Sequence, residues 1–279
     1  MQVKANLRIG ICQMMVVDDK ESNLRKAQEM IRKASRQGCN LVVLPEMFNC
    51  PYESMAFPSY AEPIPNGETS LLLSRTAREE HIYLVGGSIP EIDSGGRIFN
   101  SCPVFGPDGQ FLGCHRKVHL FDVDLESGLS FRESDTLKAG NNLTIIPTPA
   151  ATLGILICYD IRFPELSRLL SLSGVQVLVV PAAFNTTTGP AHWEILLRTR
   201  AIDNQVFVVG AAPATNPVAS YHAWGHSMVV DPWGSVLAST GSTETVLWAD
   251  LDLSRIEQVR KALPLLRHRR TDLYTLKRR

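Results

Sequence analysis

Apolar and polar positions along the chain follow a recurring order of short apolar runs and amphipathic stretches. The segment NLVVL at residues 40–44 is short and continuously apolar, which is typical of a strand buried on both faces. Residues 20–37 instead repeat apolar positions at helical spacing and are followed by Gly38, a common helix end. The same criteria predict strands at residues 7–15, 40–44, 82–86, 152–157, 175–180, 206–211, 227–230 and 246–251, and helices at 20–37, 71–81, 164–173 and 191–204.

This order predicts one layered α/β domain. Strands that alternate with helices of about 10 to 15 residues indicate α/β layering. The segment at residues 100–114 adds antiparallel pairing around the turn Pro107-Asp108-Gly109, so we expect a mixed sheet. No Gly/Ser linker, low-complexity block or internal repeat divides the sequence. We therefore predict a single domain over residues 1–279, with its core at 7–252 and a C-terminal extension at 253–279.

Composition and charge narrow the class of protein. Apolar residues make up 44% and charged residues 20%, which excludes a disordered chain. The 28 Lys and Arg balance 28 Asp and Glu, so no net field favours nucleic acid or an acidic membrane, and we expect neither as a partner. Residues 255–279 are basic but lack the aromatic or groove-reading pattern of a nucleic-acid arm. We expect this tail to pack Leu263, Leu265 and Tyr274 against another part of an assembly.

Location and redox state follow from the first residues and the cysteines. Lys4, Arg8 and Gln13 interrupt the apolar stretch that a secretory signal needs, and no run of 18 apolar residues occurs. We therefore expect a cytoplasmic protein without a membrane span. The six cysteines form no C-x-x-C pair, so a zinc ribbon or thioredoxin-type site has no support.

Three polar residues follow predicted strands or lie in loops, where open α/β sheets hold ligands. Glu46 follows the strand at 40–44, Lys117 lies in the segment HRKVH, and Cys158 ends the apolar segment GILIC. A thiol at a strand-to-helix turn lies near backbone N–H groups that favour a thiolate and stabilise an oxyanion. Taken singly, each has a simpler reading: a solvated loop acid, a surface cation and an inert core thiol.

Taken together, these residues resemble a known family. The segments LPEMF (44–48), RKVHLFD (116–122) and GILICYDIRFPE (154–165) are similar in order and spacing to the three signature blocks of the nitrilase, or carbon-nitrogen hydrolase, superfamily. The resemblance extends from about residue 7 to 275. It implies an α-β-β-α sandwich, a Glu-Lys-Cys catalytic set and a homodimer in which two sandwiches form eight layers.

Within that superfamily the chain most resembles the omega-amidases, which hydrolyse the terminal amide of 2-oxoglutaramate and 2-oxosuccinamate. Deaminated-glutathione amidases are the alternative, because they share GPAHWE, GHSMVVDPWG and a segment like HRRTDLY. The Asn-Thr-Thr-Thr and Tyr-His-Ala-Trp segments favour omega-amidase. The stretches that carry this resemblance are 104–113, 117–124, 183–194, 200–207 and 220–234.

Amide hydrolysis by a thiol assigns a role to each candidate. We expect Glu46 to act as general base toward Cys158 and then as general acid to the leaving nitrogen, with its pKa raised by burial. Lys117 and the backbone N–H of Tyr159 are the expected oxyanion donors. Glu133, in SFRES, matches a second glutamate that in this superfamily positions the substrate and the lysine.

The remaining assignments concern binding and alternatives. Tyr52 and Arg162 are candidates for binding the substrate carboxylate, with packing or surface roles equally compatible. His119, His192 and His226 lack a local motif for a Cys-His pair or a metal site, and no metal or organic cofactor is expected. No Gly-rich nucleotide motif occurs. A non-catalytic interaction protein on the same fold stays an alternative, although all four candidate residues are present.

Overall fold

The computed structural model describes residues 7–124 and 130–278. Its strands are β1 (Leu7–Gln13), β2 (Leu41–Val43), β3 (Tyr83–Val85), β4 (Ile89–Ile92), β5 (Ile98–Phe105), β6 (Phe111–Arg116), β7 (Asp122–Asp124), β8 (Ser130–Arg132), β9 (Thr144–Pro147), β10 (Thr152–Ile155), β11 (Val177–Pro181), β12 (Phe207–Ala211), β13 (Met228–Val230), β14 (Val236–Ser239) and β15 (Thr245–Leu251). The helices are α1 (Lys20–Arg36), α2 (Phe57–Tyr60), α3 (Glu68–Glu80), α4 (Pro164–Leu172), α5 (Gly189–Asn204) and α6 (Ser254–Ala262), with 3₁₀ helices at Ser54–Ala56, Glu133–Asp135 and Cys158–Arg162.

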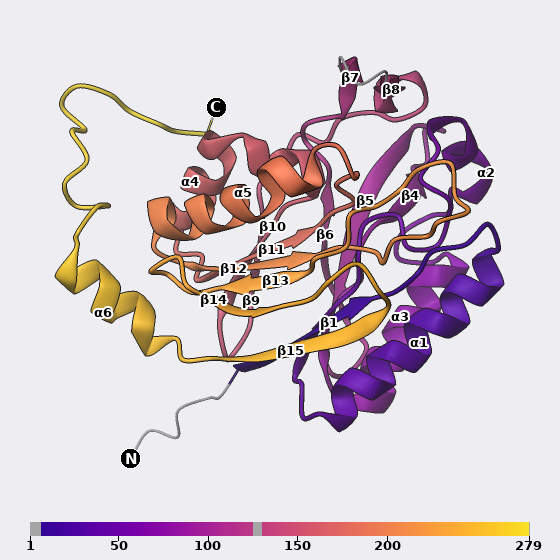
Figure 1. The fold of residues 1–279 in the computed structure, drawn as a ribbon, viewed down its shortest axis with the longest axis horizontal. Helices are drawn as coiled ribbons and strands as arrows, with labels where there is room; N and C mark the ends of the chain where they lie inside the picture. The colour runs from indigo at the N-terminus through magenta and orange to yellow at the C-terminus, as the bar shows by residue number, and fades with distance from the viewer. Residues whose placement is uncertain (1–6, 125–129, 279) are drawn as a thin grey trace.

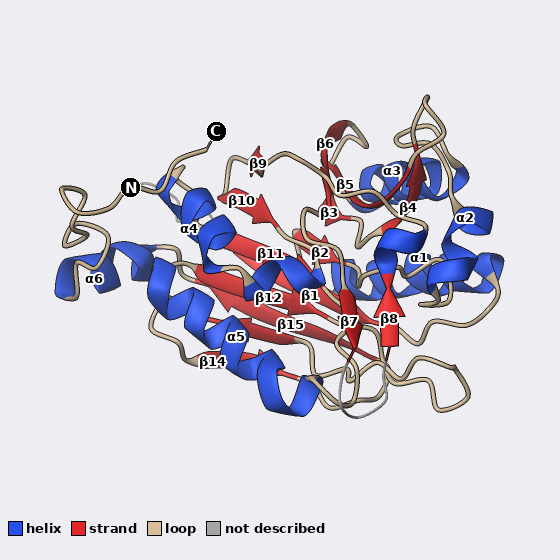
Figure 2. Ribbon diagram, turned by 90° about the horizontal axis from the view of Figure 1, so that it is seen from above, coloured by secondary structure: helices blue, strands red, loops and turns tan. Residues whose placement is uncertain are grey.

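Two mixed sheets face each other between two pairs of helices (Figures 1 and 2). The first sheet has the order β15-β1-β2-β3-β5-β4, with β6 paired to β5, and the second has the order β14-β13-β12-β11-β10-β9. Helices α1 and α3 cover the outer face of the first sheet, and α4 and α5 cover the second (Figure 1). The predicted α-β-β-α sandwich and mixed pairing are confirmed.

Alternation along β2 shows how the sequence builds these layers. Leu41 and Val43 belong to the core between the two sheets, whereas Val42 packs with the buried faces of α1 and α3. Successive side chains of a strand point to opposite faces, so a strand covered on both faces must be apolar at every position. This is why the central strands read as continuous apolar runs.

A buried glutamine ties the two sheets together. Gln13, at the end of β1, is fully buried. Its Oε1 accepts hydrogen bonds from the Ser227 backbone N–H at 2.9 Å, the Ser227 hydroxyl at 2.8 Å and the Thr240 hydroxyl at 2.8 Å. Its Nε2 donates to the carbonyls of Gly241 and Thr243, each at 2.7 Å. All its hydrogen-bonding positions are used, so the amide stabilises the junction at little cost in desolvation.

Several element boundaries differ from the sequence prediction. The helix predicted from residue 71 begins at Glu68, because its first turn is polar and the apolar periodicity starts later. The strand predicted at 152–157 ends at Ile155, and the following residues form the turn that carries Cys158. The basic tail contains helix α6, which was not predicted. Within the described residues, no helix is long and apolar enough to cross a membrane.

Candidate active site

Three strand ends bring the predicted chemical groups together. Glu46 follows β2, Lys117 follows β6 and Cys158 follows β10, so two of them come from the first sheet and one from the second. All three side chains are buried, with exposed fractions of 1%, 0% and 5%. Glu133, in the 3₁₀ helix at residues 133–135, is also fully buried.

The loop that carries Glu46 is fixed by the chain after β3. The Met47 N–H donates to the Ser88 hydroxyl at 3.1 Å, and the Ser88 N–H donates to the Pro45 carbonyl at 3.1 Å. Gly87 has a φ of +62°, and a Cβ on it would collide with the Pro45 carbonyl. Met47 itself adopts a φ of +49°, a conformation rare for a non-glycine residue. The backbone on both sides of Glu46 is therefore held in place by the segment after β3.

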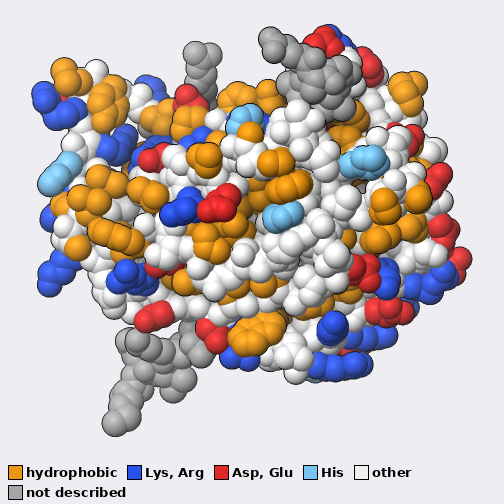
Figure 3. Space-filling view, viewed as in Figure 1, with side chains coloured by type: hydrophobic (Ala, Val, Ile, Leu, Met, Phe, Trp, Pro, Cys, Tyr) orange, Lys and Arg blue, Asp and Glu red, His pale blue; other side chains and the backbone are white. Residues whose placement is uncertain are grey.

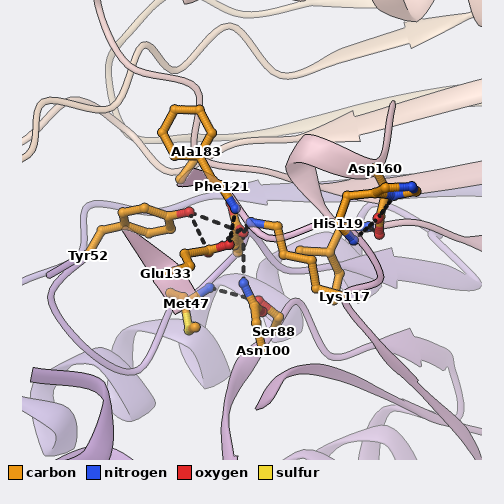
Figure 4. A network of polar contacts seen from close by, with 12 residues as sticks. Met47, Tyr52, Ser88, Asn100, Lys117, His119, Phe121, Glu133, Asp160 and Ala183 are labelled. Atoms are coloured by element: carbon orange, nitrogen blue, oxygen red, sulfur yellow. Dashed lines mark hydrogen bonds and ion pairs between the residues drawn. The ribbon is translucent and has the colours of Figure 1, made fainter. Parts of the chain in front are cut away.

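Asp160 organises the turn that carries Cys158. Its Oδ2 accepts from the Ile157 N–H at 3.1 Å and lies 3.1 Å from His115 Nε2. Its Oδ1 accepts from the His119 N–H at 2.9 Å and lies 2.8 Å from His119 Nδ1 (Figure 4). Burial opposes ionisation of Asp160, but the hydrogen bonds from both histidines outweigh it and lower its pKa. One carboxylate thus links the turn that carries Cys158 to the segment around Lys117 and supports the positive φ of +44° at Cys158.

Lys117 lies between two carboxylates. Its Nζ is 2.9 Å from Glu46 Oε1 and 2.8 Å from Glu133 Oε1. Asn100 Nδ2 donates to the same Glu46 oxygen at 2.8 Å (Figure 4). The other oxygen, Glu46 Oε2, is buried and has no hydrogen-bond partner among the described residues. Glu46 is anchored through one oxygen, which leaves the second available for proton transfer.

Glu133 is bound through both oxygens. Oε1 accepts from Lys117 and from the Tyr52 hydroxyl at 3.1 Å, and Oε2 accepts from the Phe121 N–H at 2.7 Å. A carboxylate whose two oxygens are both occupied is suited to holding a cation in place. The hydrogen-bond pattern therefore distinguishes the two buried glutamates.

Burial and charge shift the pKa values in opposing ways. Burial raises the pKa of Glu46; Lys117 lowers it and Glu133 raises it, with a net upward shift. Burial also raises the pKa of the Cys158 thiol, Glu46 adds to this, and Lys117 and the Ala183 N–H reduce it. Burial disfavours the charged form of Lys117, but Glu133 and Glu46 outweigh it and raise the lysine's pKa well above its ordinary value. Both shifts favour the ammonium form of Lys117 and the neutral thiol form of Cys158.

Two cavities adjoin these groups. A small one of about 10 Å³ is lined by Cys158, Tyr159 and Arg162, and a larger one of about 280 Å³ is lined by Glu46 and Tyr52. Ala183 and Tyr221 line both cavities, and the Tyr221 hydroxyl donates to the Ala183 carbonyl at 2.5 Å.

Both predicted substrate-binding residues adjoin the site. Tyr52 lies 3.4 Å from Glu46 Oε1 through its hydroxyl, and its ring stacks on Phe131. The Arg162 guanidinium lies 4.7 Å from the Phe184 ring centroid and 3.2 Å from His192 Nδ1. Arg162 thus supplies a cationic side chain to the lining of the small cavity, which Cys158 also lines.

The histidines weighed as alternatives have other partners. His119 contacts Asp160 and stacks on Phe163, with ring centroids 3.7 Å apart. His226 Nδ1 lies 2.7 Å from the Trp224 carbonyl. Among residues 7–124 and 130–278, no group of three or more His, Cys, Asp and Glu side chains is placed to hold a metal ion.

Asn100 and Asp160 were missed at the sequence level, as was the contribution of the Phe121 backbone N–H. Asn100 lies inside an apolar strand, β5, and is fully buried. A polar residue in such a run is an available signal, because burial requires a hydrogen-bond partner. Asp160 lies within the GILICYDIRFPE segment, but its two histidine partners, His115 and His119, are more than 40 residues away along the chain.

Comparison with known proteins agrees with this geometry. Residues 8–261 match the sequence profile described as Carbon-nitrogen hydrolase. The chain belongs to the carbon-nitrogen hydrolase family. This carbon-nitrogen hydrolase is 50% identical to the mouse protein named Omega-amidase NIT2 over 98% of both chains, and 48% identical to the human one over 97% of this chain and 98% of that chain.

Solved structures share this fold, and one of them is described with an active site cysteine. Yeast Nit3, described as a member of branch 10 of the nitrilase superfamily, superposes with a TM-score of 0.88 at 42% identity, covering 95% of this chain and 97% of that one. A mutant of the amidase from Nesterenkonia sp. AN1 superposes with a TM-score of 0.77 at 25% identity, covering 96% of this chain and 95% of that one. That structure shows covalent addition of the acetamide moiety of fluoroacetamide at the active site cysteine. This carbon-nitrogen hydrolase is accordingly a cysteine-dependent amidase.

Proposed function

We propose that this carbon-nitrogen hydrolase is an omega-amidase that converts 2-oxoglutaramate or 2-oxosuccinamate to the 2-oxo dicarboxylic acid and ammonia. The observation that carries the proposal is the unpartnered Oε2 of Glu46 beside Lys117 and the Cys158 thiol. Identity of about half the residues to omega-amidases over nearly the whole chain supports the choice of substrate class.

Acylation begins with proton transfer from the Cys158 thiol to Glu46. The thiolate sulfur then attacks the amide carbon, and the carbonyl oxygen becomes an oxyanion. Lys117 Nζ and the Tyr159 backbone N–H stabilise that charge. Collapse of the tetrahedral intermediate breaks the carbon–nitrogen bond, and Glu46 returns its proton to the nitrogen. Ammonia departs, and the acyl group stays bound to Cys158 as a thioester.

Deacylation reuses the same groups. Glu46, again ionised, takes a proton from water, and the resulting hydroxide attacks the thioester carbon. The oxyanion forms at the same donors, the carbon–sulfur bond breaks, and the thiolate recovers its proton. Glu133 acts as a positioning residue that fixes Lys117 throughout.

The substrate's distal carboxylate requires a cation near the nucleophile. Arg162 meets this requirement, since it lines the small cavity together with Cys158 and Tyr159. Tyr52 lies on the Glu46 side, where its hydroxyl contacts both buried glutamates. We assign carboxylate binding to Arg162 and orientation of the amide end to Tyr52.

Ammonia release from 2-oxoglutaramate, measured beside deaminated glutathione, tests the proposal. We expect the wild-type protein to prefer 2-oxoglutaramate in kcat/KM, and Cys158→Ala to abolish turnover. Cys114→Ala is the matched control, because that thiol lies outside the site. Preference for deaminated glutathione would reassign the substrate and keep the mechanism. Absence of cysteine-dependent turnover of either amide would contradict the proposal and favour other amides, then nitriles, and finally a non-catalytic role.

We also infer a homodimer. Exposed apolar side chains gather over α4, α5 and the C-terminal segment, on the left of Figure 3. They include Leu172, Ile195, Ile202 and Tyr274, of which Ile195 is 65% exposed. Contiguous exposed apolar surface marks association sites. Light scattering is expected to give twice the 30.9 kDa monomer mass, and Ile195→Glu to give the monomer mass; a monomeric wild type would refute the inference.

We assign the enzyme to the cytoplasm. We also propose that residues 1–279 form one domain and that residues 253–279 contribute to the dimer. All six cysteines are free, and the proposed chemistry needs a reduced thiol, which a reducing compartment maintains. Cell fractionation tests the location: recovery in an oxidising compartment would contradict it. Removal of residues 253–279 is expected to leave a folded monomer.

A further inference from the structure

Tyr221 contacts groups on two sides of the active site. It lies in the segment between β12 and β13 and lines both cavities, and its hydroxyl donates to the Ala183 carbonyl at 2.5 Å. Its ring centroid lies 4.5 Å from that of Tyr52, whose hydroxyl points toward Glu133 (Figure 4). The steps of hydrolysis described above give Tyr221 no role.

Ala183 joins Tyr221 to the nucleophile. It follows the end of β11, and its N–H is hydrogen-bonded to the sulfur of Cys158. Its carbonyl accepts from the Tyr221 hydroxyl, whereas the carbonyl of the next residue, Phe184, accepts from the Trp224 N–H at 2.7 Å. The backbone beside Ala183 is thus fixed by backbone partners, and Ala183 itself is fixed by a side chain.

The Ala183 N–H matters whenever the sulfur is charged. A thiolate forms twice in the proposed cycle, first when Cys158 loses its proton and again when the thioester breaks. An N–H donor stabilises this anion more than the neutral thiol. The N–H and the carbonyl of Ala183 belong to successive rigid peptide planes that meet at its Cα. Fixing the carbonyl therefore restricts the direction in which the N–H points.

We propose that Tyr221 is a positioning residue for the nucleophile, and that it acts by holding the Ala183 N–H against the Cys158 sulfur. The inference rests on the role of Cys158 in the proposed function. A phenol has one proton, and Tyr221 uses it on the Ala183 carbonyl, so its hydroxyl is no donor to the substrate. Burial and the nearby Cys158 and Glu46 raise the pKa of Tyr221 well above its ordinary value, so the hydroxyl keeps this proton.

Tyr221→Phe tests the hydroxyl alone, because the ring that packs on Tyr52 is kept. We expect iodoacetamide to alkylate Cys158 about tenfold more slowly in this variant, since the thiolate loses a well-placed donor. The acid limb of the alkylation rate should stay in the same pH range, because the hydroxyl does not contact Glu46. For 2-oxoglutaramate, kcat should fall by a similar factor, with KM within about threefold of wild type.

Ser171→Ala is the matched control. It removes a buried hydroxyl that donates to the Asn204 carbonyl at 3.1 Å, away from Cys158. We expect it to lower the urea midpoint of unfolding and to leave the alkylation rate unchanged. Circular dichroism establishes that both variants fold.

Three results would overturn the inference. The first is a wild-type alkylation rate in folded Tyr221→Phe. The second is a lower kcat with unchanged alkylation, which would mean that the hydroxyl acts on the substrate. The third is an equal fall of the alkylation rate in Ser171→Ala, which would indicate general loosening of the fold. Alkylation needs no substrate, so failure of the wild type to hydrolyse 2-oxoglutaramate would refute the omega-amidase proposal, and the alkylation rate would still decide this inference.

Discussion

Lys117 and Glu46 meet through one carboxylate oxygen only: Nζ lies 2.9 Å from Oε1, while Oε2 has no hydrogen-bond partner within the described residues. The two oxygens of Glu46 therefore have separate tasks. Oε1 keeps the side chain in place through Lys117 and Asn100, and Oε2 is left for proton transfer. Glu133, bound at both oxygens, lacks this division.

Replacing Lys117 by Met should slow the chemical step. The substitution removes one oxyanion donor, so we expect kcat to fall by about 10²-fold or more, with KM within about threefold of wild type. Steady-state ammonia release measures both constants, and circular dichroism establishes that the variant folds. A folded variant with wild-type kcat would contradict the assigned role.

The acid limb of the pH profile should reflect Glu46. The base must be ionised to accept the thiol proton, and burial raises its pKa above the ordinary 4.5. Activity should therefore fall as pH drops through this raised pKa, and kcat/KM measured against pH reports it for the free enzyme. The rate at which iodoacetamide alkylates Cys158 should fall over the same acidic pH range. In Glu46→Gln this pH dependence of the alkylation rate should disappear. A limb at the pKa of an exposed glutamate would count against the assignment.

Replacing Asp160 by Asn should weaken both the fold and the catalytic turn. An amide offers one acceptor oxygen where the carboxylate contacts Ile157, His115 and His119, so we expect a loss of about 2 to 4 kcal/mol in the free energy of unfolding. Displacement of Cys158 should also lower kcat by about 10²-fold. Urea unfolding and ammonia release measure these effects.

Asp231 provides the comparison for Asp160. It is buried, and its Oδ1 accepts from the Trp233 and Ser235 N–H groups in the turn between β13 and β14. Asp231→Asn should lower stability and leave kcat unchanged. If both variants lower kcat to the same degree, Asp160 has no special positioning role.

Replacing Arg162 by Met should affect anionic amides selectively. Loss of a charged hydrogen bond to the substrate carboxylate should reduce kcat/KM for 2-oxoglutaramate by about 10- to 100-fold. Propionamide, which has no carboxylate, serves as the neutral comparison and should be turned over as before. An equal loss for both amides would indicate that Arg162 supports the fold of the site.

The sequence predicts the residues that carry the site's chemistry better than the residues that hold them in position. Positions after strands or in loops and the three family segments locate Glu46, Lys117 and Cys158, and the match to the superfamily's second glutamate locates Glu133. The structure brings all four together. Asp160 acts through partners that only the tertiary fold brings near, so no local pattern reports its role. The sequence positions of Glu46 and Glu133 also do not reveal that Glu133 is hydrogen-bonded through both carboxylate oxygens and Glu46 through only one.

The missed elements have a similar explanation. Strand β14 is largely exposed, and β4 contains a proline and a glutamate, so neither shows the apolar run by which strands are predicted. Their pairing with neighbours, rather than their own pattern, makes them strands. The longer helix α1 was found because its apolar periodicity repeats over several turns.

The pairing of β1 with β15 has a consequence for how the enzyme is made. Residues 7–13 hydrogen-bond in register with residues 245–251, so one side of the first strand has no partner until the ribosome has added more than two hundred further residues. An unpaired strand edge invites pairing with other nascent chains, and such distant contacts slow folding. We expect amidase activity to appear abruptly near the end of translation, and the nascent chain to depend on protection of that edge until then.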